Sequence, residues 1–213
     1  MITLVIGGTR SGKSAMAEQL ARELDASVTY LATGACANGD GEMAARIAAH
    51  RQRRPADWVT VEEPHAVVEA LEKIEGAVLL DSLGSWLAAD VENADIEALI
   101  GALLSRSGDT IVVSEEVGMS VHPPTVLGRR FADRLGELNS RVAEITDRCL
   151  FVVAGRVVEL PPHSDDGTSY PLASFERPGN KRHRGLRGLR GALSFLTTIG
   201  GAAPPDARSL DWF

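Results

Sequence analysis

The sequence predicts an α/β fold, a doubly wound and mostly parallel sheet with helices on both of its faces. Short apolar runs alternate along the chain with amphipathic segments of helical spacing, and the connections between them are short. Several of the apolar runs are continuous, which is typical of parallel strands covered on both faces. Hydrophobic residues make up 44% of the 213 residues and aromatic residues only 5%, so we expect one full domain with an aliphatic core.

Six apolar runs are the expected strands, and five amphipathic segments are the expected helices. The strands are predicted at residues 2–6, 27–32, 58–61, 77–80, 110–113 and 149–153. The helices are predicted at residues 14–24, 42–53, 65–74, 94–105 and 127–145. Ligands of doubly wound sheets bind beyond the carboxyl ends of the strands. The residues that follow each strand are therefore the candidates for a functional site.

The pattern changes after about residue 156, which predicts a domain at residues 1–160 and a poorly structured tail at residues 161–213. The tail holds seven lysines and arginines against five acidic residues, and its most basic run spans residues 181–190. One interpretation of this run is a solvated segment. The other is a weak contact with anionic phospholipid, since apolar residues follow it.

Composition and charge argue against several classes of protein. The formal net charge is −7 and the excess of acid lies in residues 1–160, which argues against nucleic acid as the chief partner. The two cysteines, Cys36 and Cys149, make no disulfide framework, so we expect reduced thiols and a cytoplasmic protein. The chain enters its first apolar run without a charged leader, and no run approaches the roughly 18 residues of a membrane span.

A phosphate-binding motif follows the first expected strand. The residues from Gly7 to Ser14 read G-G-T-R-S-G-K-S, which matches the P-loop pattern G-x-x-x-x-G-K-[ST] between a strand and a helix. A chance glycine turn is the alternative, but strand, full motif and helix coincide. Backbone N–H groups would bind phosphate, Lys13 would reach the terminal phosphates, and the Ser14 hydroxyl would hold Mg²⁺. The predicted nucleotide contacts here are Gly7, Gly8, Thr9, Arg10, Ser11, Gly12, Lys13 and Ser14.

A second candidate metal contact stands at the end of the expected strand 77–80. Asp81 follows four apolar residues, and a carboxylate in this place in P-loop proteins faces Mg²⁺ or its water shell. The alternative is an ordinary N-cap of a following helix, for which Asp is a preferred residue. The two roles are compatible, so Asp81 can serve in both.

The segment from Glu42 to Pro55 carries a histidine among arginines. Four-residue spacing places Glu42, Arg46 and His50 along one helical face. Nearby positive charge disfavours a protonated imidazole, so His50 should be neutral and nucleophilic near pH 7. The arginines would bind a polyphosphate, and attack by His50 on phosphorus would give a nucleotidyl-histidine. A basic, solvated helix is the alternative. The arginines concerned are Arg46, Arg51, Arg53 and Arg54.

Other charged residues follow the expected strands or mark a helix face. Glu62 and Glu63 would contact a ribose hydroxyl, a guanine edge or a metal, or they form a charged pair that faces a turn. Glu115 and Glu116 lie where a phosphoryl acceptor would be oriented or deprotonated. One face of the last expected helix would meet either phosphate or water through Arg129, Arg130 and Arg134.

Together these motifs resemble the family of bifunctional adenosylcobinamide kinase / adenosylcobinamide-phosphate guanylyltransferase, from cobalamin biosynthesis. The resemblance covers roughly residues 1–158. A P-loop alone is unspecific, but the segment around His50 in this context is highly specific. The matching stretches are G-G-T-R-S-G-K-S, Y-L-A-T at Tyr30 to Thr33, E-M-A-A-R-I-x-x-H-x-x-x-R-P at Glu42 to Pro55, W-x-x-x-E at Trp58 to Glu62, L-L-D at Leu79 to Asp81 and E-V-G-M at Glu116 to Met119.

The resemblance implies two reactions in the P-loop domain at residues 1–160. ATP or GTP phosphorylates adenosylcobinamide, and GTP then donates GMP through a guanylyl-histidine. His50 would be the nucleophile and Lys13 the second catalytic residue, with Mg²⁺ held by Ser14 and Asp81. Beyond the P-loop, the implied nucleotide contacts are Leu31, Ala32, Thr33, Arg51, Gln52, Arg53, Arg54, Glu62 and Asp81.

The resemblance also suggests a homo-oligomer, with a trimer as the specific form, and it leaves rival functions open. One rival is a P-loop kinase of another small metabolite, in which His50 only binds phosphate. The other is a nucleotide-dependent switch ATPase or GTPase, which has no need of the His50 segment. The sequence departs from the family in two ways. Asn often precedes Glu-Val-Gly in the family, whereas Glu115 stands there in this chain, and this chain continues beyond about residue 160, where family members usually stop.

Overall fold

The computed structural model describes residues 1–24, 27–34 and 54–162. These residues form a seven-stranded sheet of order β3-β2-β4-β5-β1-β6-β7, and every neighbouring pair is parallel except β6 with β7. The strands are β1 (Ile2–Gly7), β2 (Val28–Ala32), β3 (Val59–Glu62), β4 (Ala77–Asp81), β5 (Thr110–Glu115), β6 (Arg148–Val153) and β7 (Arg156–Leu160). The predicted fold class, a mostly parallel α/β sheet, is confirmed.

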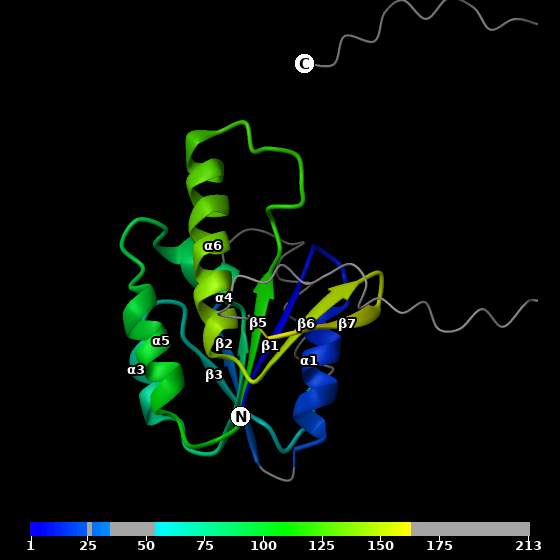
Figure 1. Ribbon diagram of the computed structural model, residues 1–213. Helices are drawn as coiled ribbons and strands as arrows, with labels where there is room; N and C mark the ends of the chain where they lie inside the picture. The colour runs from blue at the N-terminus through cyan, green and yellow to red at the C-terminus, as the bar shows by residue number, and fades with distance from the viewer. Residues whose placement is uncertain (25–26, 35–53, 163–213) are drawn as a thin grey trace, which may run out of the picture. The chain divides into compact units, whose positions relative to one another are not determined.

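Helices cover both faces of the sheet (Figure 1). One face carries α1 (Lys13–Arg22), and the opposite face carries α3 (Val67–Lys73), α4 (Leu83–Ala89), α5 (Ile96–Ser105) and α6 (Val126–Ile145). The predicted helix at residues 42–53 and the predicted tail lie outside the described residues, so the domain boundary near residue 160 stays a prediction.

The core consists of two apolar layers because successive side chains of a strand point to opposite faces. In β1, Leu4 and Ile6 pack in the layer beneath α3 to α6, whereas Val5 packs in the layer beneath α1. The buried hydrophobic side chains of the described residues are aliphatic except Tyr30 and Trp86, which confirms the expected core composition.

Strand order decides which residues meet at the carboxyl edge of the sheet. β5 lies between β1 and β4, with Gly7 in register with Glu115 and Asp81 in register with Val113. The ends of these three strands are therefore neighbours, although they come from distant parts of the chain. They place the P-loop beside two carboxylates that follow other strands.

Two elements were not among the predicted strands and helices. β7 forms a hairpin with β6 through Ala154 and Gly155, whose φ angles of 51° and 69° suit a tight two-residue turn. All of its side chains are exposed, so no buried face imposes a hydrophobic pattern. α4 reads L-G-S-W-L-A-A, and with Ser85 as its single polar side chain it shows no amphipathic period.

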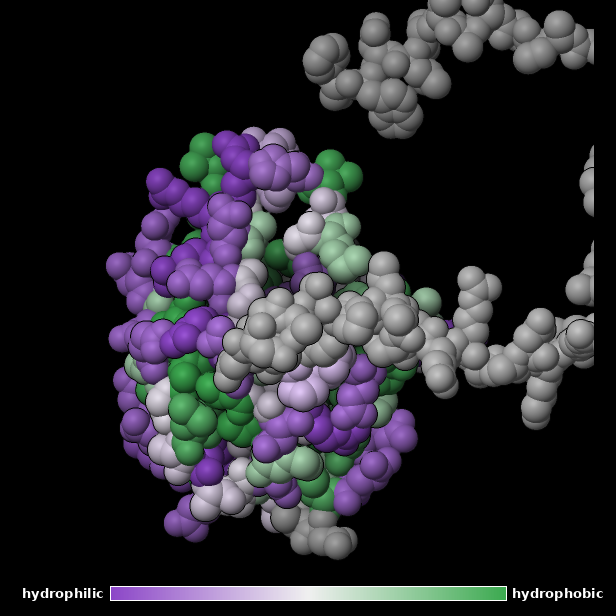
Figure 2. All heavy atoms as spheres, viewed as in Figure 1, coloured by the Kyte–Doolittle hydropathy of each residue, from purple (hydrophilic) through white to green (hydrophobic). Residues whose placement is uncertain are grey.

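No helix among the described residues combines the length and the apolar character needed to cross a membrane. Several apolar side chains are exposed between the loop after β5 and the start of α6, and separate green atoms stand among purple ones at the top of Figure 2. This group comprises Met119, Val121, Val126 and Leu127.

Arg106 ties the end of α3 to the strand that carries Asp81. Its guanidinium donates to the carbonyl oxygens of Leu71, Ile74 and Gly76 at 2.6, 2.7 and 2.7 Å. Partial burial lowers the pKa of Arg106 from its usual value. The charge is therefore held by carbonyl groups at the helix terminus, where helix dipoles favour a cation.

We expect Arg106→Leu to lower the free energy of unfolding by about 2–3 kcal/mol, because it leaves several carbonyl groups without a charged donor. Urea denaturation followed by circular dichroism measures this loss. Arg130→Gln is the matched control, since it removes an exposed ion pair with Glu92 and should cost less than about 1 kcal/mol. Equal losses in the two variants would contradict the role of Arg106.

Candidate active site

The P-loop joins β1 to α1 as its motif predicts. The Ser11 N–H donates to the Gly8 carbonyl at 3.2 Å, which closes a turn. Gly12, the N-cap of α1, has a φ of 99°, a left-handed conformation that glycine adopts without strain. The N-cap glycine has no side chain, and the Lys13 N–H donates to Ser11 Oγ at 3.3 Å. The next N–H groups lie in the first turn of the helix, where an anion binds well.

Backbone hydrogen bonds connect the P-loop to the segments that follow β5 and β6. The Gly7 carbonyl accepts from the Glu116 N–H at 3.0 Å, and the Ser11 carbonyl accepts from the Gly155 N–H at 2.9 Å. A Cβ atom on Gly7 would lie 2.4 Å from the Val152 carbonyl oxygen and 2.7 Å from Ser11 Oγ. A side chain at residue 7 would therefore push the loop off its neighbours.

Lys13 faces a carboxylate that comes from the tip of β5. Its Nζ lies 3.5 Å from Glu115 Oε1, and the two side chains are 11% and 28% exposed. Ser82 Oγ donates to both oxygens of Glu115 at 2.9 and 3.0 Å, and the Gly84 N–H donates to Oε2 at 3.1 Å. Glu115 was not among the predicted nucleotide contacts, although its place after a strand was the signal for it.

Asp81 accepts a hydrogen bond from the buried phenol of Tyr30. Burial is the main cause that raises the pKa of Tyr30 far above its usual value, and Asp81 raises it further by charge and hydrogen bonding. The N-cap of α4 is Ser82, whose Oγ accepts from the Ser85 N–H at 3.3 Å. The interpretation of Asp81 as the N-cap is therefore wrong, because the helix begins one residue later than that role requires.

Arg54 lies on the face of the Tyr30 ring. Its guanidinium carbon is 3.5 Å from the ring centroid, a cation–π contact, and its NH1 donates to Thr60 Oγ1 at 3.3 Å. The buried Nε has no hydrogen-bond acceptor among the residues that the structure describes. Trp58 adds a tilted ring contact with Tyr30, at 6.5 Å between centroids. The catalytic candidate His50 lies outside the described residues, as do Arg51, Gln52 and Arg53.

The residues at the end of β2 serve the backbone of the site. Thr33 is buried, and its hydroxyl accepts from the Ser82 N–H at 2.8 Å and donates to the Ser82 carbonyl at 2.6 Å. The Leu31 side chain is fully buried in the core. Contact of Leu31 with a nucleotide stays a prediction.

The pair Glu62 and Glu63 has two different environments. Glu62 is exposed at the end of β3. Glu63 Oε1 accepts from the N–H groups of Ala66 and His65 at 2.9 and 3.0 Å, and these bonds lower its pKa. Glu63 therefore caps the turn into α3, which confirms the turn interpretation for this residue.

The three arginines of α6 contact protein atoms. Arg129 donates to the Pro123 and Pro124 carbonyls at 3.1 and 3.0 Å, Arg130 NH1 lies 2.6 Å from Glu92 Oε1, and Arg134 donates to the Ala94 carbonyl at 2.8 Å. These contacts connect α6 to the loop that precedes it and to the loop between α4 and α5. The Arg130 side chain is also 60% exposed, in agreement with the water interpretation for that residue, and the phosphate interpretation stays a prediction.

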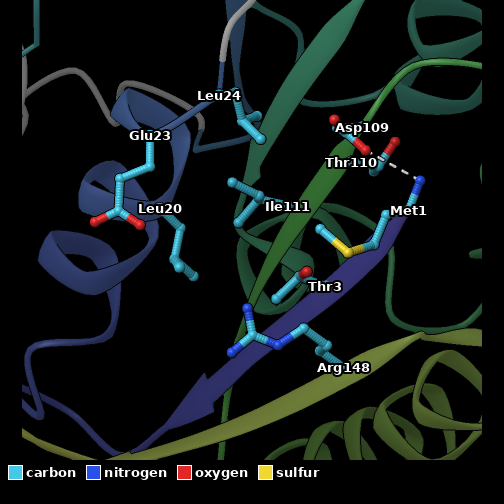
Figure 3. A pocket seen from close by; sticks show the side chains of 9 residues that line it. All are labelled: Met1, Thr3, Leu20, Glu23, Leu24, Asp109, Thr110, Ile111 and Arg148. Atoms are coloured by element: carbon cyan, nitrogen blue, oxygen red, sulfur yellow. Dashed lines mark ion pairs between the residues drawn. The ribbon is translucent and has the colours of Figure 1, made fainter.

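A pocket of about 110 Å³ lies at the opposite, amino edge of the sheet (Figure 3). It opens at the starts of β1, β5 and β6, and its rim includes an ion pair of 3.1 Å between the Met1 amino group and Asp109. None of the predicted site residues lines it. The candidate chemistry is therefore at the carboxyl edge and not in this pocket.

Comparison with known proteins decides the family. The family model described as cobinamide kinase / cobinamide phosphate guanyltransferase matches residues 3–160. The chain belongs to this family. Membership confirms the resemblance carried by the motifs and favours an enzyme over a nucleotide switch. The match spans both the P-loop and the segment that contains His50.

Individual relatives agree with this membership of the cobinamide kinase / cobinamide phosphate guanyltransferase family. The bifunctional adenosylcobalamin biosynthesis protein CobP of Pseudomonas aeruginosa is 44% identical over 170 residues, which cover 75% of this chain and 97% of the relative. CobU of Escherichia coli K12, which carries the same description, is 36% identical over 183 residues and covers 75% of this chain and 99% of the relative.

Among solved structures, the flagellar accessory protein FlaH of Methanocaldococcus jannaschii has a TM-score of 0.40 and 12% identity, covering 73% of this chain and 74% of that chain. This likeness carries no argument about function.

We expect Tyr30→Phe to change how the stability of this family member depends on pH. The raised pKa means that the folded protein retains the phenol proton, while the unfolded chain loses it above about pH 10. The free energy of unfolding of the wild type should therefore fall as pH rises past that value, and the variant should lack this component. Urea denaturation between pH 8 and pH 11 measures the difference.

Tyr170→Phe is the control for this titration, because the sequence contains only two tyrosines. It should keep the alkaline loss of the wild type. The same pH dependence in wild type and Tyr30→Phe would contradict the assignment. At pH 8, loss of the hydrogen bond to Asp81 should also lower the free energy of unfolding by about 1–2 kcal/mol.

Proposed function

We propose that this chain phosphorylates adenosylcobinamide with ATP or GTP and then transfers GMP from GTP, through a guanylyl-histidine at His50, to give adenosylcobinamide-GDP. The observation that carries the proposal is the meeting of the N-terminus of the P-loop helix, Lys13 and two strand-end carboxylates at one edge of the sheet. Family membership supports the choice of substrate. The proposal assigns both reactions to the domain at residues 1–160.

The phosphoryl transfer requires the terminal phosphate to be held and its charge to be neutralised. The acceptor hydroxyl oxygen bonds to the terminal phosphorus, the bond from that phosphorus to its bridging oxygen breaks, and a nucleoside diphosphate leaves. The α1 N–H groups bind the phosphate chain, and the Lys13 ammonium stabilises the charge that develops on the transferred group.

The donor set of the site suits Mg²⁺. Ser14 offers a hydroxyl in the first turn of α1, and Asp81 offers a carboxylate whose orientation is maintained by Tyr30. Oxygen donors of this kind are the ligands of Mg²⁺, which would be held mainly by the nucleotide phosphates. When bound, Mg²⁺ would neutralise phosphate charge. No group of three or more metal-binding side chains occurs among the residues with described positions, in agreement with a cation that arrives with the nucleotide.

The nucleotidyl transfer uses the segment that ends at Arg54. His50 attacks the α-phosphorus of GTP, pyrophosphate leaves, and the phosphate of adenosylcobinamide phosphate then attacks the same phosphorus and releases the imidazole. Two-step transfer avoids holding two polyanions face to face in one transition state. The contact of Arg54 with Tyr30 supports this proposal, because it anchors the end of the His50 segment beside Asp81.

The proposal also includes the cellular location and the oligomeric state of the enzyme. Two cysteines without a disulfide framework support a cytoplasmic enzyme. The family resemblance supports a homo-oligomer, with a trimer as the specific form, and sedimentation equilibrium of the full chain tests it.

We expect Lys13→Ala to reduce kcat/KM for phosphorylation of adenosylcobinamide by about 100-fold or more, since one preorganised charged donor is lost. Steady-state assays with ATP and with GTP measure the loss and identify the donor. Lys73→Ala, an exposed position at the end of α3, is the matched control and should retain activity. Retained phosphorylation in Lys13→Ala would mean that the P-loop assignment is wrong.

Incubation with α-labelled GTP tests the second reaction. The wild type should acquire an acid-labile label, because a phosphorus–nitrogen bond to imidazole hydrolyses in acid, and His50→Ala should acquire none. His65→Ala, a surface histidine before α3, should label like the wild type. Label that persists in His50→Ala would contradict the covalent mechanism and favour a simple kinase.

A further inference from the structure

The carboxylate of Glu115 has no role in the two reactions proposed above. It comes from β5, the strand that separates the P-loop strand from the Asp81 strand, and Gly7 is its register partner. Its Oε1 lies 3.5 Å from the ammonium of Lys13, the group that would stabilise the transferred phosphate. A carboxylate at this point repels the negatively charged phosphates of a nucleotide, so its presence needs a chemical reason.

The surroundings of Glu115 orient the carboxylate independently of Lys13. The Ser82 hydroxyl and the Gly84 N–H donate to it, with the Gly84 N–H directed at Oε2. A Cβ atom on Gly84 would lie 2.1 Å from Oε2, so glycine at residue 84 makes room for the carboxylate. When Lys13 turns to a bound phosphate, these donors still hold Glu115, and Oε1 is the oxygen that loses a partner.

We propose that Glu115 is the general base of the kinase reaction, an inference that rests on the proposed function. The acceptor hydroxyl donates its hydrogen bond to Oε1. As the new oxygen–phosphorus bond forms and the bridging bond breaks, the hydroxyl proton passes to the Glu115 carboxylate. The nucleoside diphosphate leaves with the electron pair of the broken bond, and Glu115 returns the proton to solvent after product release.

The neighbouring carboxylate is a poorer base for this step. Glu116 Oε1 accepts from the Gly118 N–H at 2.7 Å, within its own loop, and its backbone N–H binds the Gly7 carbonyl. Glu116 therefore points its acceptor at the loop that leaves the site. Asp81, the other strand-end carboxylate, accepts from Tyr30 and serves the cation in the proposed mechanism.

Glu115→Gln tests the proposal, because it retains size and hydrogen bonding but does not accept a proton. With adenosylcobinamide as acceptor, kcat should fall by about 100-fold or more. KM for the nucleotide should stay level or decrease, since a charge that competes for Lys13 has been removed. Glu115→Asp should recover part of kcat, because it restores a carboxylate. Glu72→Gln, on the exposed face of α3, is the control for removal of a carboxylate and should match the wild type.

Gly84→Ala is a second variant that keeps every functional group and displaces the carboxylate. It should lower kcat even though Glu115 is intact, and thermal unfolding monitored by circular dichroism establishes that each variant is folded. The proposal is overturned if Glu115→Gln keeps kcat within about threefold of the wild type, or if it raises KM with kcat unchanged, which is the result of a purely structural role. A larger kcat loss in Glu116→Gln than in Glu115→Gln also overturns it.

These outcomes are separate from failure of the proposed function. A wild-type protein that forms no adenosylcobinamide phosphate with either nucleotide overturns both proposals. A wild-type protein that forms this product, beside an equally active Glu115→Gln, overturns only the role of Glu115.

Discussion

Parallel pairing of β5 between β1 and β4 is the constraint on which the described site depends. Hydrogen bonding in register makes Gly7 the partner of Glu115 and Val113 the partner of Asp81. β5 therefore extends two residues beyond the register position of Asp81, and its tip reaches the P-loop. A shift of one residue in this pairing would turn Glu115 to the other face of the sheet, because side chains alternate along a strand. The same register buries the apolar residues of β5 on both faces, so core packing maintains the site.

Charge balance explains why Lys13 and Glu115 are paired. Lys13 is only 11% exposed, and a partly buried ammonium without a partner is costly. Glu115 supplies the opposite charge in this structure, and in the proposed mechanism a nucleotide phosphate would take that place. Ser82 and Gly84 hold the carboxylate throughout, which limits reorganisation during the exchange.

Tyr30 connects Asp81 to Arg54, although the core around it consists almost entirely of aliphatic residues. Its hydroxyl donates to Asp81, and the face of its ring supports Arg54. Burial of the ring leaves the phenol dependent on this acceptor, so the side chain has little freedom. The strand tip that would serve Mg²⁺ and the end of the His50 segment are consequently held by one residue. This arrangement gives a physical basis for placing two phosphate chemistries at one edge.

The sequence by itself determined the features that contiguous residues encode. The P-loop, the strand that precedes it and the helix that follows are local, and continuous apolar runs predicted the buried parallel strands. Asp81 was found because it directly follows such a run. The His50 segment was also recognised from its own spacing, although its position stays a prediction.

Which distant residues meet at the site depends on strand order and on the packing of the sheet. Nothing in the sequence near Glu115 indicates that Ser82 and Gly84 donate to it, and nothing near Tyr30 indicates that its hydroxyl binds Asp81. Ser82 rather than Asp81 caps α4, because the strand continues one residue further than its apolar run. β7 and α4 were not predicted because neither shows the alternation of apolar and polar residues that indicates one buried face. Hydrophobic periodicity reports burial, whereas strand order and register, which bring polar groups together, result from the packing of the whole sheet.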